Sequence, residues 1–422
     1  MAHTHGVSCY RSRREFLRTG LFGLSLGMRL PWVFDHTALA IASDAFWDGR
    51  ETHPERIMVI VELAGGNDGL NTVVPYRQDA YYKLRPTLAI KAQDTLKLTD
   101  EVGLHPAMTG FKALWDAGQL AVIHGCGYPN PNRSHFTAMA YWHTAVPNGV
   151  EANGWVGRFA DAAWPQGAPN RIVNVAARQS LAVQAQRHAP VVFSDPQRFV
   201  RAGDPSEEAV YNNLLARQSE VTNKTLAFVQ DIARTASESS VTVREAIKSY
   251  QTPIAYGAES AVATLATDLR KVAALIHAGF PTRVYYVSLG GFDTHANQSG
   301  TQQQLLMYVA DALEGFLKDV QRIGRAADIA VMLFTEFGRR VAQNQSQGTD
   351  HGAATPMYII GEPVKGGAYG QYPSLDHLDD NGDLIMTTDF RRVYATMIKE
   401  WMGFEHLTMI LKGDFPTLAV FS

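Results

Sequence analysis

The sequence has few cysteines, few charged residues and no long apolar segment in its body. Two cysteines, Cys9 and Cys126, occur in 422 residues, so neither a disulfide-rich scaffold nor a cysteine-rich metal site is expected. Charged residues make up 19% of the chain and the net charge is -3, which gives no basic surplus for binding nucleic-acid phosphates. No internal run reaches the roughly 18 apolar residues of a membrane-spanning helix, so we expect no transmembrane anchor in the mature chain.

The first 42 residues have the pattern of an export signal. Ser12-Arg13-Arg14-Glu15-Phe16-Leu17-Arg18 is followed by a short apolar run at 21–28 and by small residues at 38–42. A basic region, an apolar region and a small-residue exit are typical of a secretory signal, and the paired arginines indicate the twin-arginine type. We therefore expect the twin-arginine machinery to export a domain of residues 43–422 to the periplasm or the extracellular space. The alternative is an ordinary basic amphipathic helix.

Short β-branched and aliphatic runs alternate with helical patterns along the body of the chain. This alternation predicts an α/β fold with a central, mostly parallel sheet flanked by helices. Residues 206–279 differ, because they show long helical periodicity and no convincing strand, and we interpret them as a helical insertion. Residues 363–389 have the composition of a surface loop, and residues 389–402 have that of a closing helix. The predicted strands are residues 57–63, 120–124, 171–176, 283–289, 329–334 and 356–360.

Aspartate, histidine and glutamate recur directly after these strands. Ligands in open α/β sheets bind at the carboxyl ends of the strands, so these side chains are expected to converge although they lie far apart in the sequence. Carboxylate and imidazole groups are the ligands of zinc and of harder divalent ions. Taken singly, the same residues are equally typical of turns and helix caps, but their recurrence at five strand ends predicts a metal or polar catalytic cluster. Its candidate members are Asp68, Asp293, His295, Glu336 and His351.

Ser134 is the candidate nucleophile, because it lies in a Pro- and Asn-rich loop after the strand at 120–124. A serine oxygen attacks well when a neighbouring metal favours its deprotonation. The alternative is that Ser134 caps a helix beginning at His135. Arg133 and Arg339 are candidates for holding a phosphate or sulfate group, and the alternative for them is a surface salt bridge or a cation–π contact.

Five motifs of the sequence resemble those of a known family. The chain resembles the DUF1501 family of exported bacterial proteins, which is similar to the alkaline phosphatase and sulfatase superfamily. This resemblance implies an alkaline-phosphatase-like fold with one or two divalent ions, zinc being the usual metal, around a serine-type nucleophile. The motifs are Gly65-Gly66-Asn67-Asp68-Gly69, Asn132-Arg133-Ser134-His135-Phe136, Gly290-Gly291-Phe292-Asp293-Thr294-His295, Glu336-Phe337-Gly338-Arg339 and Thr349-Asp350-His351-Gly352.

The resemblance also implies a role for each matched residue. Asp68 and Glu336 match ligands of one metal, and Asp293 and His295 match ligands of the other. His351 matches the late histidine that precedes a strand, and Ser134 matches the nucleophile. Three departures from the superfamily pattern are visible. Asp293 and His295 are two residues apart instead of four, Phe337 stands where a second-metal histidine is expected, and the sulfatase motif Cys/Ser-x-Pro-x-Arg is absent.

The sequence therefore predicts an exported, metal-dependent hydrolase. Ser134 would attack a small anionic phosphate or sulfate ester, and the ester could belong to a glycan. The alternative is a cell-envelope binding protein that has this fold and a degenerate active site.

Overall fold

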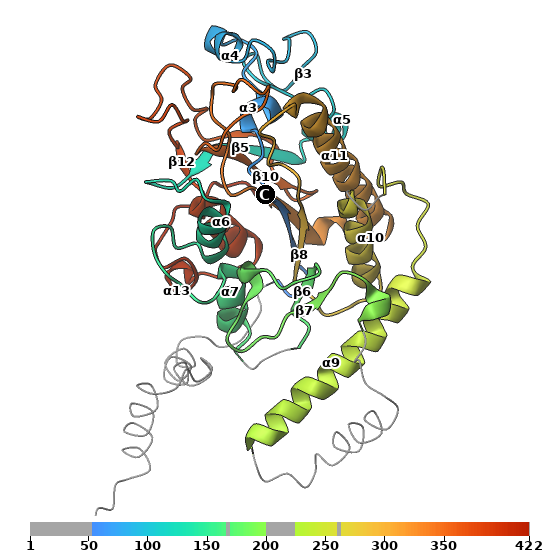
Figure 1. The fold of residues 1–422 in the computed structure, drawn as a ribbon. Coiled ribbons are helices and arrows are strands. Elements are labelled where there is room, and N and C mark those ends of the chain that lie inside the picture. Colours follow the sequence, from blue (N-terminus) through green and yellow to red (C-terminus); the bar gives the residue numbers. More distant parts are fainter. Residues whose placement is uncertain (1–52, 166–168, 200–223, 260–262, 422) are drawn as a thin grey trace, which may run out of the picture. The chain divides into compact units, whose positions relative to one another are not determined.

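A nine-stranded mixed sheet runs through the centre of the structure, a computed structural model that describes residues 53–165, 169–199, 224–259 and 263–421 (Figure 1). Its central strands consist of aliphatic and β-branched residues that are buried on both faces, as expected where helices cover both sides. The strands are β1 (Ile57–Leu63), β5 (Leu120–Gly127), β6 (Ile172–Val175), β7 (Val191–Phe193), β8 (Val284–Leu289), β9 (Ile329–Phe334), β10 (Thr355–Ile360), β11 (Gly367–Tyr369) and β12 (Thr388–Asp389).

The order of the strands is β11-β5-β10-β9-β1-β8-β6-β7, with β12 also beside β5. β1 is parallel to β8 and to β9, whereas β10 is antiparallel to both β9 and β5. The chain that enters β10 therefore lies at the same edge of the sheet as the chain that leaves β1, β5, β8 and β9. This edge is where the polar motifs meet.

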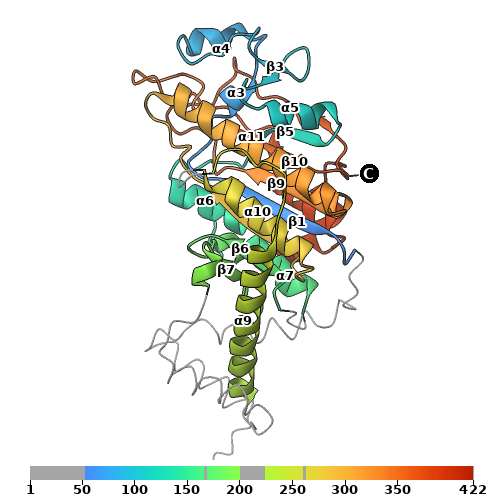
Figure 2. The ribbon, with the colours of Figure 1, turned by 90° about the vertical axis from the view of Figure 1, so that its right-hand side faces the viewer.

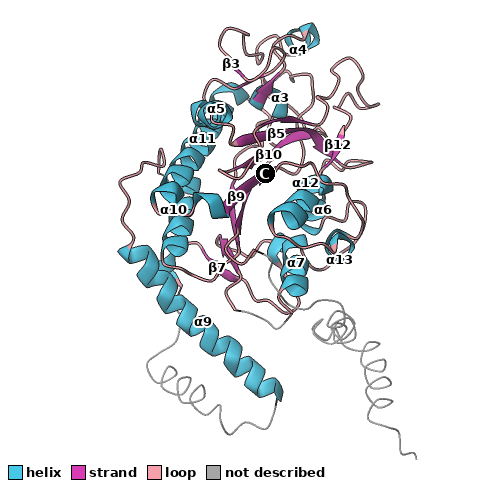
Figure 3. Ribbon diagram, turned by 180° about the vertical axis from the view of Figure 1, so that it is seen from behind, coloured by secondary structure: helices cyan, strands magenta, loops and turns pink. Residues whose placement is uncertain are grey.

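Helices cover both faces of the sheet, as Figures 1 and 3 show from opposite sides. On one face lie α5 (Thr109–Asp116), α10 (Thr264–His277) and α11 (Gln298–Arg322). In Figure 2, α10 and α11 lie in front of the strands. The other face carries α6 (His135–Thr144), α7 (Trp155–Ala163), α12 (Arg391–Ala395), a π-helical turn (Thr396–Trp401) and α13 (Leu407–Leu411).

The long helix α9 and several shorter elements complete the described structure. Above the sheet edge, a small antiparallel sheet joins β2, β4 and β3. The remaining elements are β2 (Val73–Val74), β3 (Leu96–Lys97), β4 (Gly103–Leu104), α3 (Gly69–Thr72), α4 (Asp79–Leu84), α9 (Lys224–Ser249), and the 3-10 turns Leu181–Val183, Pro196–Arg198 and Ala326–Asp328.

The predicted α/β fold with its mostly parallel sheet is confirmed, and the six predicted strands match β1, β5, β6, β8, β9 and β10. The loop expected at 363–389 also contains β11 and β12, which pair with β5. Within 206–279 the described part holds α9 and α10, and α10 is part of the layer that packs on the sheet. The predicted export signal lies outside the described residues. No helix of the described part has the length and apolarity to cross a membrane.

We expect the inner face of α11 to contribute strongly to stability. Leu313 is fully buried in the main core, and Leu313→Ala should lower the free energy of unfolding by about 2–5 kcal/mol, because it leaves a cavity. Met307 lies on the same helix with an exposed side chain, so Met307→Ala should cost under about 1 kcal/mol. Urea unfolding measures both values, and equal losses would contradict the packing described.

Candidate metal centre

Loops at one edge of the sheet bring three histidines and one aspartate together. His135 begins α6 soon after β5, Asp293 and His295 follow β8, and His351 precedes β10. Because β10 is antiparallel to its neighbours, the residue before it meets residues that follow the other strands. The ligand atoms of His135, Asp293 and His351 all lie within 4.8 Å of one another. We call these three residues and His295 the histidine cluster.

The histidine cluster is centred on a single oxygen atom. Asp293 Oδ1 lies 3.0 Å from His295 Nε2, 3.1 Å from His351 Nε2 and 3.4 Å from His135 Nε2. The Nε2 atoms of His295 and His351 are 2.9 Å apart. All three rings thus present the same nitrogen to the same carboxylate.

The opposite nitrogen of each ring is held by an acceptor. His135 Nδ1 lies 2.7 Å from Glu336 Oε1, His351 Nδ1 lies 2.8 Å from the carbonyl oxygen of Arg133, and His295 Nδ1 lies 3.2 Å from Asp350 Oδ1. A carbonyl or carboxylate oxygen can only accept, so Nδ1 carries the proton in each ring. In a neutral ring held in this way Nε2 carries a lone pair, whereas in a protonated ring Nε2 donates to Asp293.

Three nitrogen lone pairs and a carboxylate oxygen face one another, an arrangement that is repulsive unless a cation lies among them. In a tetrahedral zinc site with bonds of about 2.0–2.1 Å, neighbouring ligand atoms are about 3.3 Å apart. The distances from Asp293 Oδ1 to the three Nε2 atoms, 3.0 to 3.4 Å, are close to that value, and the ligand atoms of His135, Asp293 and His351 form a set within 4.8 Å of one another. His135 Nε2 is also buried without a hydrogen-bond partner in the described structure. His135, Asp293 and His351 together offer two imidazoles and one carboxylate, a donor set that suits zinc or a similar transition metal.

Asp293 is ionised and held in place by Arg339. Burial acts to raise the pKa of Asp293, but hydrogen bonds from Arg339 and His351 outweigh it and lower that pKa to about 2. Arg339 Nη2 lies 2.7 Å from Asp293 Oδ1. The other bonds of this buried guanidinium go to backbone carbonyls, namely those of Gly65, Gly66, Phe292 and Thr349.

The predicted role of Arg339 as an anion holder therefore differs from what its contacts support. Its N–H groups donate hydrogen bonds to acceptors within the protein, and its guanidinium is buried. It is better described as a positioning residue for Asp293.

Glu336 contacts the histidine cluster through the ring of His135. Its Oε1 accepts hydrogen bonds from the backbone N–H of Gly65 at 2.9 Å and from His135, and its Oε2 accepts from the Thr335 hydroxyl at 3.0 Å. Glu336 was expected as a metal ligand, and the structure places its carboxylate against Nδ1 of His135. Such outer carboxylates fix the tautomer of a ligating histidine.

Close backbone contacts explain the glycines of two motifs. Gly65 has φ +118°, and a Cβ there would lie 2.6 Å from the backbone nitrogen of Asp293. At Gly348 a Cβ would lie 2.2 Å from the carbonyl carbon of His295. Side chains at these two positions would push the loops apart and disturb the histidine cluster.

Asp68, which was expected as a metal ligand, has its charge balanced by a buried arginine outside the histidine cluster. Its Oδ2 pairs with Arg85 Nη1 at 2.5 Å, and both side chains are completely buried. Gln298 Nε2 donates to the same oxygen at 2.5 Å, and the Leu70 N–H donates to Oδ1 at 3.2 Å. Asp68 thus caps α3 and balances a buried arginine, and the structure does not bring it into the histidine cluster.

Ser134 lies at the N-cap of α6, as the alternative interpretation expected, although its side chain makes no cap bond. Its hydroxyl is exposed, and among the described residues it makes no hydrogen bond. The carbonyl of Arg133 holds His351, so the backbone before Ser134 lies against the histidine cluster. The Arg133 guanidinium pairs with the buried carboxylate of Asp383. Arg133 was expected to hold an anion, but its charge is used in this structural ion pair.

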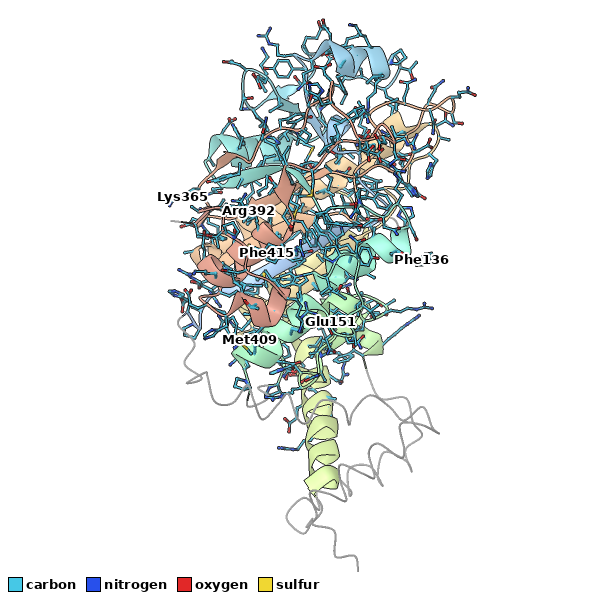
Figure 4. All side chains as sticks on the ribbon, turned by 90° about the vertical axis from the view of Figure 1, so that its left-hand side faces the viewer. Phe136, Glu151, Lys365, Arg392, Met409 and Phe415 are labelled. Atoms are coloured by element: carbon cyan, nitrogen blue, oxygen red, sulfur yellow. The ribbon has the colours of Figure 1, made fainter. Side chains whose placement is uncertain are left out.

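His135 was not among the expected ligands. It was treated as a neighbour of Ser134, although it belongs to one of the five motifs and follows a strand of the same sheet edge. Its position as first residue of α6 turns the ring toward Asp293, while the next residue, Phe136, is 92% exposed (Figure 4). The signal that could have identified it is a histidine at a strand end, the same signal that identified His295.

We expect Arg85→Met to lower the free energy of unfolding by about 3–5 kcal/mol, because it leaves the buried Asp68 carboxylate unpaired. Adding Asp68→Asn should recover part of that loss, since a neutral amide needs no counter-charge. The exposed residue Arg77 offers a control, and Arg77→Met should change stability by under about 0.5 kcal/mol. Urea unfolding of Arg85→Met, the double variant, Arg77→Met and Asp68→Asn alone tests this pairing. An Asp68→Asn variant of unchanged stability that loses metal would instead identify Asp68 as a ligand.

Comparisons with known proteins give a family and a set of distant structural likenesses. No curated protein matches the sequence. A protein of the alkaline phosphatase superfamily from Vibrio parahaemolyticus has a TM-score of 0.36 and 9% identity over 76% of this chain, which spans 63% of that protein. A sulfatase from Pseudoalteromonas sp. has a TM-score of 0.38 and 9% identity, and the match covers 91% of this chain and 77% of the sulfatase chain.

A third solved structure is the C-terminal periplasmic domain of EcEptC from Escherichia coli in complex with Zn. It has a TM-score of 0.33 and 11% identity, and the match covers 75% of each chain. Structural similarities with TM-scores this low do not establish an activity. The family model "Protein of unknown function (DUF1501)" matches residues 55–410. The chain belongs to the DUF1501 family.

Proposed function

We propose that this protein is a metal-dependent hydrolase of phosphate or sulfate esters, with one divalent ion held by the histidine cluster. The observation that carries the proposal is that three Nε2 lone pairs converge on one oxygen of Asp293 while each Nδ1 is held as a donor. An ion bound there would supply Lewis-acid stabilisation to an ester oxygen. Zinc suits the donor set best.

The surrounding residues keep this donor set in place. Glu336, Asp350 and the Arg133 carbonyl hold the three rings with Nε2 inward. Arg339 keeps the Asp293 carboxylate ionised and oriented. A site that is organised in this way needs little rearrangement to bind, which favours both affinity and catalysis.

Ser134 remains the proposed nucleophile. Its exposed hydroxyl begins α6, where the helix N-terminus favours negative charge. The Ser134 oxygen would form a bond to phosphorus or sulfur as the bond to the alcohol breaks, and the hydroxyl proton would leave with the alcohol. Water would then cleave the seryl ester and restore the side chain.

The proposed setting of this activity is outside the cytoplasm. The pattern at 1–42 supports export of the protein by the twin-arginine machinery to the periplasm or beyond. A small anionic ester, free or on a glycan, is the proposed substrate class. The net charge of -3 supports no role for nucleic acid.

A binding protein of the cell envelope is the second candidate. The observation in its favour is that Arg133 and Arg339, the two arginines expected to hold the anion, are committed to Asp383 and Asp293. A protein of this kind would hold a ligand at the same sheet edge without cleaving it.

We expect the natively folded protein to contain close to one equivalent of zinc or a related metal. His135→Ala and His351→Ala should each weaken zinc binding at least about tenfold, and Glu336→Gln should do so by about 10- to 100-fold through His135. His377 is exposed and outside the histidine cluster, so His377→Ala should bind normally. Elemental analysis and competition with a chelator measure these values. Metal-free protein with unchanged binding in the variants would reject the site.

We expect Ser134→Ala to lower hydrolysis of 4-nitrophenyl phosphate or sulfate by at least about a thousandfold, as the loss of a nucleophile does. Its metal content should remain that of the wild type, because Ser134 is not in the histidine cluster. Ser249, exposed at the end of α9, provides the matched control. Activity that survives in Ser134→Ala would reject the nucleophile, and inactive wild-type protein that holds its metal would favour the binding protein.

A further inference from the structure

A buried polar triad lies between α6 and the sheet, outside the histidine cluster. Glu62 of β1, His143 in the last turn of α6 and Tyr286 of β8 meet at one carboxylate oxygen. His143 Nε2 lies 2.7 Å from Glu62 Oε2 and 3.1 Å from the Tyr286 hydroxyl, which donates a hydrogen bond to the same Oε2. All three residues are buried. We call them the α6 triad.

The α6 triad holds an ionised carboxylate inside the protein. Burial acts to raise the pKa of Glu62, but the hydrogen bond and charge of His143 and the hydrogen bond from Tyr286 outweigh it and lower that pKa. Burial and the charge of Glu62 raise the pKa of Tyr286 well above its usual value, so its hydroxyl keeps the proton that it donates. Apolar residues of similar volume are often as stabilising as a buried network of this kind, or more so. Stability alone is therefore a weak reason for three polar side chains at this position.

α6 depends on its last turn for its position. Its buried side chains are Ala138 and the consecutive residues Trp142, His143 and Thr144, whereas Phe136 near its start is 92% exposed. The apolar residues of α6 are distributed around the helix and are not gathered on one face. Burial of an apolar stripe, which usually seats a helix on a sheet, therefore does little to orient this one.

The α6 triad joins the same three elements that meet again at the histidine cluster. β1 continues into Gly65, whose N–H donates to Glu336, and β8 continues into the loop that carries Asp293. α6 begins with His135, whose Nδ1 lies 2.7 Å from Glu336 Oε1 and whose Nε2 lies 3.4 Å from Asp293 Oδ1. A contact that fixes α6 against β1 and β8 thus also fixes His135 against its neighbours.

A small error at one end of α6 becomes larger at the other. His143 lies about two helical turns, or about 12 Å, from His135. A tilt of about 5° around the last turn would move the first turn by about 1 Å, whereas metal–ligand distances must be correct to about 0.2 Å. Ser134 directly precedes the helix and would move with it.

We propose that Glu62, His143 and Tyr286 are positioning residues for the metal centre, because they fix the tilt and rotation of α6 and thereby the place of His135 and Ser134. This inference rests on the proposed function, since it assigns to the α6 triad the alignment of a metal ligand and of the nucleophile. The α6 triad acts through the helix and not by contact with the ion or the substrate.

Zinc affinity of the full-length protein, measured by competition with a chelator, tests the proposal. The triple variant Glu62→Leu/His143→Phe/Tyr286→Phe replaces the α6 triad by apolar side chains of similar size and should fold as stably as the wild type. We expect it to bind zinc at least about tenfold more weakly. Glu62→Gln keeps an oxygen that accepts from both partners, so it should bind within about threefold of the wild type. If the triple variant does not fold, Glu62→Met/His143→Met replaces it with the same expected loss, because methionine fills irregular space.

His188 provides the matched control, because it is also a buried histidine beside a carboxylate. Its Nδ1 lies 3.1 Å from Oδ1 of Asp161, which belongs to α7 and not to α6. His188→Phe should leave the zinc affinity unchanged. Wild-type affinity in the apolar variants, or an equal loss in His188→Phe, overturns the proposal.

A readout on the metal-free protein separates this inference from the proposed function. The His135 proton lies on Nδ1 against Glu336, and the nitrogen NMR shifts of the ring, assigned with His135→Ala, report this tautomer. If the wild type binds no zinc, the proposed function fails and the spectrum decides. A tautomer that is lost in the apolar variants and kept in His188→Phe supports the positioning role, and one that is kept in all of them overturns it.

Discussion

Five acceptors from three separate loops converge on the buried guanidinium of Arg339. Four are carbonyl oxygens of Gly65, Gly66, Phe292 and Thr349, and the fifth is the carboxylate of Asp293. One planar cation thus joins the loops that follow β1 and β8 to the loop that precedes β10. The positive charge also compensates the aspartate on which the three imidazoles converge. Removing it would release the loops and leave Asp293 without its partner, which is why the geometry of the histidine cluster depends on this side chain.

Much of the fold could be predicted from the sequence because its strands are buried on both faces. Ile329–Phe334 is a continuous apolar run and Ile57–Leu63 is apolar except for Glu62, and the bounds of both match the structure. β11 and β12 are two or three residues long and are stabilised by pairing with β5, so their local sequence carries little signal. The antiparallel direction of β10 could not be predicted from the sequence, because pairing direction depends on distant partner strands and not on local composition.

The candidate site was predicted in its position and only partly in its members. Strand ends identified Asp293, His295 and His351, since their convergence follows from sheet topology alone. The roles of Asp68 and Arg339 depend on tertiary partners, Arg85 in one case and backbone carbonyls in the other, and no local pattern reveals them. His135 was overlooked because a helix start can turn a side chain in either direction. The pairing of Asp68 with Arg85 gives this buried carboxylate a fixed positive partner within the protein.

The spacing of the ligands along the chain has a consequence for how the protein acquires its metal. His135 and His351 come from the first and last thirds of the sequence, and their rings meet only when β10 is paired between β5 and β9. A nascent chain on the ribosome therefore has no competent site until nearly all of it has been synthesised. An ion bound by the histidine cluster, as proposed, would therefore enter after folding, in contrast to small zinc-dependent domains that are unfolded without their ion. The compartment in which the chain first folds would thus set the earliest point at which the ion can bind.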